Sequence, residues 1–121
     1  MYRELRTERL LLRPLGGRQI GAVSVALDET RTEGELGWIF DSRWQKQGYA
    51  REAASAVSDF AIRELKVKKL IAQCDCRNSD SFRLMQRIGM IPEESVGTRI
   101  YPKTGERAGE FTCVLTIADM V

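Results

Sequence analysis

The sequence of 121 residues contains no histidine. Ser/His and Cys/His hydrolases need an imidazole to take the proton of the nucleophile, so this absence argues against both classes. Cysteine is scarce, and the pair Cys74 and Cys76 has no second closely spaced pair, which argues against a zinc site. We therefore expect no metal cofactor, and we expect Cys74, Cys76 and Cys113 to be reduced thiols on buried or half-buried strands.

Long apolar runs are also missing. No run approaches the roughly 20 residues of a membrane-spanning helix, and the polar amino terminus MYRELRTER is unlike a signal peptide. The net charge of +2 is too small to indicate nucleic acid or a membrane surface as a partner. These features predict one cytoplasmic globular domain over residues 1–121, with no nucleic-acid or membrane partner.

What the sequence does contain is a hydrophobic period that changes several times along the chain. Small apolar residues recur at helical spacing from Ala50 to Leu65, and Asn78 and Gly89 have the positions of a cap and a stop for a second, short helix. Strand patterns cover residues 10–13, 20–27, 33–40, 70–76, about 91–101 and 110–117. This order predicts an α/β or α+β fold with a single sheet and packed helices.

The turn before the first helix, RWQKQGYA at residues 43–50, is basic and glycine-containing. A helix that starts there presents unpaired N–H groups and the positive end of its dipole. Gly48 would let a ligand approach the backbone, and Arg43, Lys46 and Arg51 would add positive charge. The turn therefore suggests an anion site, although a plain helix start with solvated basic side chains accounts for the same residues.

Five motifs follow one another along the chain: TERLLLRPL at residues 7–15, IG at 20–21, ELGW at 35–38, QKQGYA at 45–50, and NSDS at 78–81 with RIGM at 87–90. Together they resemble those of the GNAT acyltransferase superfamily, in particular the subgroup of ribosomal-protein N-terminal acetyltransferases. QKQGYA resembles the Q/R-x-x-G-x-G/A loop that binds the pyrophosphate of acyl-CoA. The resemblance covers most of residues 7–115 and implies a mixed, mostly antiparallel central sheet.

The resemblance also implies a place for acetyl-CoA as co-substrate. Backbone groups of Ile39 and Phe40 would pair with pantetheine where this strand separates from the strand at 70–76. Asn78 would hydrogen-bond the pantetheine arm, although a simple capping role explains Asn78 as well. The pyrophosphate would lie on the backbone N–H groups of Gln45, Lys46, Gln47, Gly48, Tyr49 and Ala50.

The implied reaction is N-acetyl transfer to a primary amine, either a protein N-terminus or a small amine. Ser81 is the candidate proton donor to the leaving thiolate, and Glu35 is the carboxylate expected to take the amine proton directly or through water. A water-facing hydroxyl and a strand-edge salt bridge are the alternative interpretations of these two residues. Tyr49 and Tyr101 are further hydroxyls that could approach the site.

The main departure from the family lies after the first strand, where members carry two helices and a strand. Here only the short stretch PLGGR at residues 14–18 is present, so either the domain is truncated or a segment is absent from this sequence. A truncated domain would have an open acceptor site, and a second copy of the chain could cover it as a homodimer. Two other functions stay open: an acyl-CoA-binding or regulatory module without transferase activity, and a small nucleotide- or phosphate-binding domain.

Overall fold

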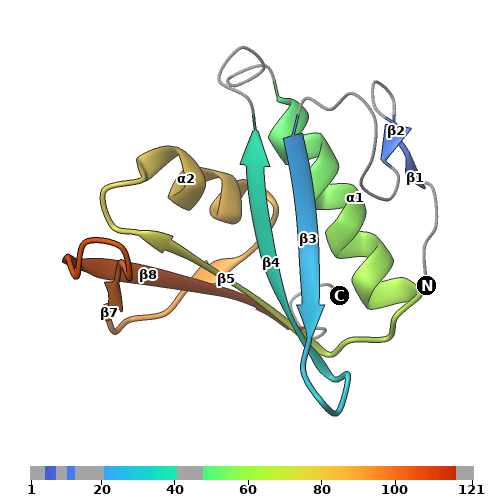
Figure 1. Ribbon diagram of the computed structural model, residues 1–121. Helices are drawn as coiled ribbons and strands as arrows, with labels where there is room; N and C mark the ends of the chain where they lie inside the picture. Colours follow the sequence, from blue (N-terminus) through green and yellow to red (C-terminus); the bar gives the residue numbers. More distant parts are fainter. Residues whose placement is uncertain (1–4, 8–10, 13–20, 41–47, 117–121) are drawn as a thin grey trace.

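The computed structural model describes residues 5–7, 11–12, 21–40 and 48–116. The elements within these ranges form a sheet with helices beside it (Figure 1). In chain order they are β1 (Leu5–Arg6), β2 (Leu11–Leu12), β3 (Gly21–Leu27), β4 (Glu33–Phe40), α1 (Tyr49–Arg63), β5 (Lys69–Asp75), α2 (Ser79–Arg87), β6 (Ile91–Pro92), β7 (Gly97–Ile100) and β8 (Arg107–Thr116).

The central sheet has the strand order β3-β4-β5-β8-β6, with β7 paired to the other end of β8. β4 and β5 run parallel, and their connection passes through α1. The remaining described pairs in this sheet are antiparallel. The predicted mixed, mostly antiparallel sheet with packed helices is therefore confirmed.

Both α1 and α2 pack on the same face of this sheet. Leu36 of β4, Leu70 of β5 and Met85 of α2 belong to one buried cluster, and burial of each such side chain is worth roughly 1.5–3 kcal/mol. The face of α1 that meets the sheet is built from small residues, including Ala54 and Ala61, which are fully buried. These small side chains let the helix approach the strands closely, as the sequence predicts.

The alternation along β4 places its residues on two faces. Leu36 is buried and Trp38 packs against the core, whereas Glu35 and Ile39 are exposed on the opposite face. The predicted strand at 33–40 matches β4 at both ends. The helix start near residue 49 and the strand near 70–76 are also confirmed within one or two residues.

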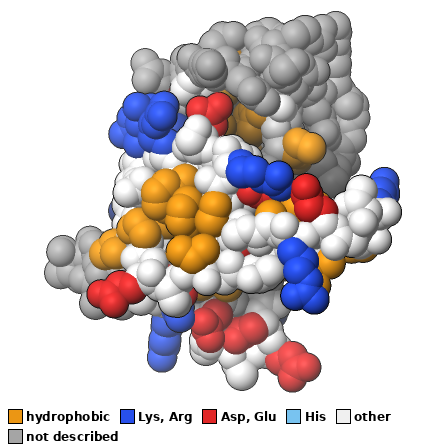
Figure 2. Space-filling view, turned by 90° about the vertical axis from the view of Figure 1, so that its left-hand side faces the viewer, with side chains coloured by type: hydrophobic (Ala, Val, Ile, Leu, Met, Phe, Trp, Pro, Cys, Tyr) orange, Lys and Arg blue, Asp and Glu red, His pale blue; other side chains and the backbone are white. Residues whose placement is uncertain are grey.

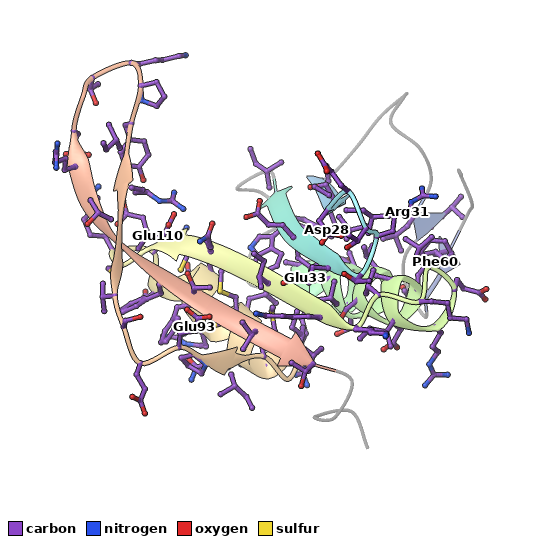
Figure 3. The ribbon with its side chains drawn as sticks, turned by 90° about the horizontal axis from the view of Figure 1, so that it is seen from below. Asp28, Arg31, Glu33, Phe60, Glu93 and Glu110 are labelled. Atoms are coloured by element: carbon purple, nitrogen blue, oxygen red, sulfur yellow. The ribbon has the colours of Figure 1, made fainter. Side chains whose placement is uncertain are left out.

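The β3–β4 turn is held by the Asp28 carboxylate. It accepts hydrogen bonds from the backbone N–H of Thr32 at 3.0 Å and of Glu33 at 3.2 Å, and Arg31 completes the turn with φ of 60°. The N–H of Glu33 is the main cause that lowers the pKa of Asp28. Asp28, Arg31 and Glu33 lie together at this turn in Figure 3.

The segment predicted as one strand at 91–101 forms two strands instead. Pro92 pairs with Cys113 and Gly97 pairs with Glu110, so an advance of five residues along this segment corresponds to only three residues along β8. The extra residues leave the ladder between β6 and β7, and they separate the two strands. Alternation of side chains alone does not reveal such an interruption.

Charges of both signs are interspersed on the side of the molecule that Figure 2 shows, around a group of hydrophobic side chains. A surface that binds nucleic acid typically gathers Lys and Arg on one face or along one stripe. The described atoms on this side have no such stripe. Among the described residues, no helix has the length and hydropathy that crossing a membrane requires.

Candidate active site

The strands β4 and β5 pair over only part of their length. Their ladder runs from Glu33, opposite Lys69, to Leu36, opposite Ala72. Beyond this point β4 stays paired with β3 up to Phe40, while β5 stays paired with β8 up to Asp75. Each strand therefore follows its own outer neighbour, and the twisted sheet opens between them.

A pocket of about 260 Å³ lies in this opening. Its walls come from β4, β5, the start of α2 and the β7–β8 hairpin. The lining residues are Leu36, Gly37, Trp38, Gln73, Cys74, Asp75, Asn78, Ser81, Arg99 and Tyr101. Segments distant in the sequence thus meet at the place where the strands separate.

The start of α1 has an unusual backbone conformation. Gly48 is the N-cap residue with φ of 82°, and it has no side chain that could cap the first turn. Its carbonyl accepts the first helical hydrogen bond, from the N–H of Glu52 at 3.0 Å. A left-handed glycine at the amino terminus of a helix lets an anion approach the backbone at the positive end of the helix dipole. Arg43, Gln45, Lys46 and Gln47, which complete the predicted loop, lie outside the described residues.

The start of α2 brings Asn78 and Ser81 to the pocket. The Asn78 side-chain oxygen accepts from the N–H of Ser81 at 3.1 Å, which confirms the predicted N-cap. The cap uses only the side-chain oxygen of Asn78. The side-chain NH₂ group is a separate hydrogen-bond donor, because an amide carries donors as well as an acceptor. The hydroxyl of Ser81 accepts a hydrogen bond from Nε1 of Trp38, on β4, at 3.3 Å.

A network of charged residues forms the pocket wall on the hairpin side. Asp75 accepts two side-chain hydrogen bonds from Arg77, at 3.0 and 2.7 Å, and one from the Tyr101 hydroxyl at 2.7 Å. Arg99 forms an ion pair with Glu110 at 2.8 Å, and its Nη1 atom donates a hydrogen bond to the Tyr101 hydroxyl oxygen at 3.4 Å. The Arg77 and Tyr101 hydrogen bonds hold the pKa of Asp75 far below its usual range. Asp75 therefore ties the β7–β8 hairpin to the end of β5.

The acetyltransferase (GNAT) domain family model matches residues 5–91 of the chain, which is more than half of its length. The chain belongs to the GNAT acetyltransferase family. It is 36% identical over 77 residues to the uncharacterized N-acetyltransferase YnaD of Bacillus subtilis, and this match covers 64% of the chain and 45% of the relative.

Solved structures agree with this assignment. A GNAT-family acetyltransferase from Bacillus anthracis is 29% identical, with a TM-score of 0.73 over 80% of this chain and 58% of that one. The ribosomal-protein-S5-alanine acetyltransferase from Vibrio fischeri shares the fold at 20% identity, with a TM-score of 0.72 over 80% of this chain and 54% of that one. The GNAT chain spans about half the length of the proteins that it matches.

In this GNAT chain the structure brings some of the predicted site residues together and leaves others apart. Asn78 and Ser81 line the pocket, and Ile39 and Phe40 lie on β4 beyond the last β5 pair. Glu35 lies in the part of β4 that is still paired with β5, is exposed, and is not a lining residue. Its catalytic role stays a prediction. The stretch at 14–18, where the family carries two helices, lies outside the described residues.

Sequence reasoning did not single out Trp38, Asp75 or Arg99 as residues of the site. Trp38 matches the last position of the ELGW motif, which was a usable signal. Asp75 and Arg99 carry no motif, and only the pairing of β5 with β8 and of β7 with β8 brings them to the pocket. Cys74 on β5 and Cys113 on β8 are buried, as predicted, whereas Cys76 is half-buried in the turn after β5 rather than on a strand, and all three are free. Burial raises the pKa of Cys74, so its thiol stays neutral in the pocket.

Proposed function

We propose that this chain transfers an acetyl group from acetyl-CoA to a primary amine, either a protein N-terminus or a small amine, by direct transfer. Membership of the GNAT family supports acetyl transfer to an amine. The observation that carries the proposal is the opening between β4 and β5, with the Ser81 hydroxyl and the Asn78 amide in its wall. This opening offers an extended ligand a strand edge and places polar groups in its wall.

The described residues fit acetyl-CoA in two respects. The left-handed Gly48 at the start of α1 suits the pyrophosphate, which residues 45–50 would hold through backbone N–H groups at the positive end of the helix dipole. The edge of β4 beyond Leu36 suits the pantetheine arm, because an extended ligand can hydrogen-bond a strand edge at Ile39 and Phe40. Asn78 would donate its side-chain NH₂ group to that arm. When bound, acetyl-CoA supplies the acetyl group as an activated thioester.

The transfer forms a C–N bond at the acetyl carbonyl carbon and breaks the C–S bond. The amine loses one proton and the departing sulfur gains one, so the reaction needs a proton acceptor and a proton donor. We assign the donor role to Ser81, which lies in the pocket. We assign the acceptor role to Glu35 acting through water, because its exposed carboxylate does not line the pocket.

The test is free-thiol release from acetyl-CoA with a panel of amines: peptides with free N-termini and small polyamines. We expect thiol release that depends on both substrates. Calorimetric binding of acetyl-CoA without thiol release would instead identify an acyl-CoA-binding module. Thermal stabilisation by ATP or GTP but not by CoA would contradict both.

Two variants test the catalytic assignment in the same assay. General acid and base groups typically contribute about 10²–10⁴-fold each, so both losses should be visible. We expect Ser81→Ala to lower turnover with little effect on acetyl-CoA affinity, and Glu35→Gln to lower it most at low pH, where free amine is scarce. Parent-like turnover of both variants from about pH 6 to 9 would remove the catalytic roles and leave only cofactor binding.

A further inference from the structure

The Trp38 indole meets the Ser81 hydroxyl across the pocket. Nε1 of Trp38, on β4, lies 3.3 Å from Oγ of Ser81, on α2, and both residues line the opening. An indole nitrogen can only donate a hydrogen bond, so the Ser81 oxygen is the acceptor in this contact. The hydroxyl proton of Ser81 therefore points away from Trp38 and is left for another partner.

We propose that Trp38 is a positioning residue that aims the Ser81 hydroxyl proton at the sulfur of the leaving thiolate. This inference rests on the transferase function proposed above. When the C–S bond breaks, the Ser81 proton goes to sulfur, the amine proton passes through water to Glu35, and the Ser81 oxygen regains a proton from solvent. Trp38 transfers no proton in this step. Its N–H group stabilises the negative charge that develops on the Ser81 oxygen as that proton leaves.

The two residues are held by rigid elements, which such a role needs. Trp38 packs against the buried core and pairs with Val23 in the β3–β4 ladder. The Asn78 cap fixes the backbone of Ser81 through a hydrogen bond of 3.1 Å. Rotation of the Ser81 side chain is then the freedom that the Trp38 hydrogen bond restricts. The Trp38–Ser81 hydrogen bond thus connects the two walls of the opening at the Ser81 hydroxyl, the proposed proton donor.

The test is Trp38→Phe, which keeps an aromatic ring against the core but removes the N–H donor together with part of the ring volume. We expect kcat for thiol release to fall about 3- to 10-fold, the range that one hydrogen bond is worth, with acetyl-CoA affinity within about twofold. We expect no further fall when Trp38→Phe is combined with Ser81→Ala, because the contact is already lost in that background.

The same double-mutant cycle identifies the results that contradict the inference. If Trp38→Phe lowers kcat by the same factor in the parent and in the Ser81→Ala background, Trp38 acts through packing. This result would overturn the positioning role of Trp38 and leave the donor role of Ser81 in place. Parent-like turnover of Ser81→Ala would overturn the donor role of Ser81, and a parent that releases no thiol with any amine would overturn the transferase proposal. Either result would remove the role of Trp38 with it.

A spectroscopic measurement tests the contact without turnover. The chain has two tryptophans, and Trp38→Phe identifies which indole ¹H–¹⁵N signal belongs to Trp38. We expect Ser81→Ala to shift this signal and to speed exchange of its proton with solvent. An unchanged Trp38 signal would show that the hydrogen bond is absent in solution and would overturn the inference.

Discussion

Gly48 begins α1 in a conformation that few other residues adopt. Its φ of 82° lies in the left-handed region, where a β-branched side chain is strained. A side chain here would also stand where the proposal places the pyrophosphate of acetyl-CoA. The glycine therefore serves both the helix start and the approach of the ligand.

We expect Gly48→Val to abolish acetyl-CoA binding, measured by calorimetry, while circular dichroism shows the fold largely retained. Gly89→Ala is the matched control, since Gly89 also has a positive φ, of 99°, but ends α2 away from the α1 start. The control should lose stability and keep its affinity. Unchanged affinity in Gly48→Val would exclude this turn from the cofactor site.

The β7–β8 hairpin is tied to β5 by side chains as well as by the backbone ladder. Asp75 ends β5 and accepts from Tyr101, which follows β7, while Arg99 of β7 pairs with Glu110 of β8. In Figure 3, Glu110 lies on the part of β8 beside β7, apart from the turn of Asp28. This network defines one wall of the pocket, and it depends on a charged Asp75.

The lowered pKa of Asp75 gives the network a direction of pH dependence. A free aspartate has a pKa of about 3.9, so the stabilisation is complete above that pH and is lost as the pH falls through the lower native value. We expect Asp75→Asn to lower the urea midpoint at pH 7 and to flatten its decline between about pH 5 and 2.

Asp59→Asn, which removes an exposed carboxylate from α1, is the control for this experiment. It should leave the urea midpoint at pH 7 close to that of the parent. Parallel curves for the parent and Asp75→Asn would mean that the network does not contribute to stability.

At the scale of the whole molecule, the two sheet faces differ. The described helices cover one face, while exposed residues of β3 and β4 such as Ser24, Glu35 and Ile39 lie on the other. Ile39 is 73% exposed. Exposed apolar side chains beside a strand pair can be covered by a second copy of the chain.

We expect the 121-residue chain to form dimers that cover the sheet near residues 10–27. Sedimentation equilibrium at high micromolar concentration should give twice the monomer mass of 13.7 kDa. Ile39→Glu should shift the dimer toward monomer, whereas Val96→Glu, at a 58% exposed position between β6 and β7, should not. A monomer under these conditions would contradict the prediction.

The sequence alone determined the features that depend on neighbouring residues. The bounds of β4, the small-residue face of α1, the Asn78 cap and the glycine at the start of α1 all follow from local periodicity and short-range hydrogen bonds. These features were therefore predictable, and with the family motifs they pointed to the place where β4 and β5 separate.

The tertiary structure decided which side chains face that opening. Trp38 and Ser81 are 43 residues apart, and Asp75 and Tyr101 are 26 apart, so no local pattern records either contact. Each contact exists because β4 and β5 separate after Leu36 while β8 stays paired with β5. The same geometry leaves Glu35 outside the pocket, because it lies where β4 is still paired with β5, and alternation along the strand already places its side chain on the face opposite Leu36 and Trp38.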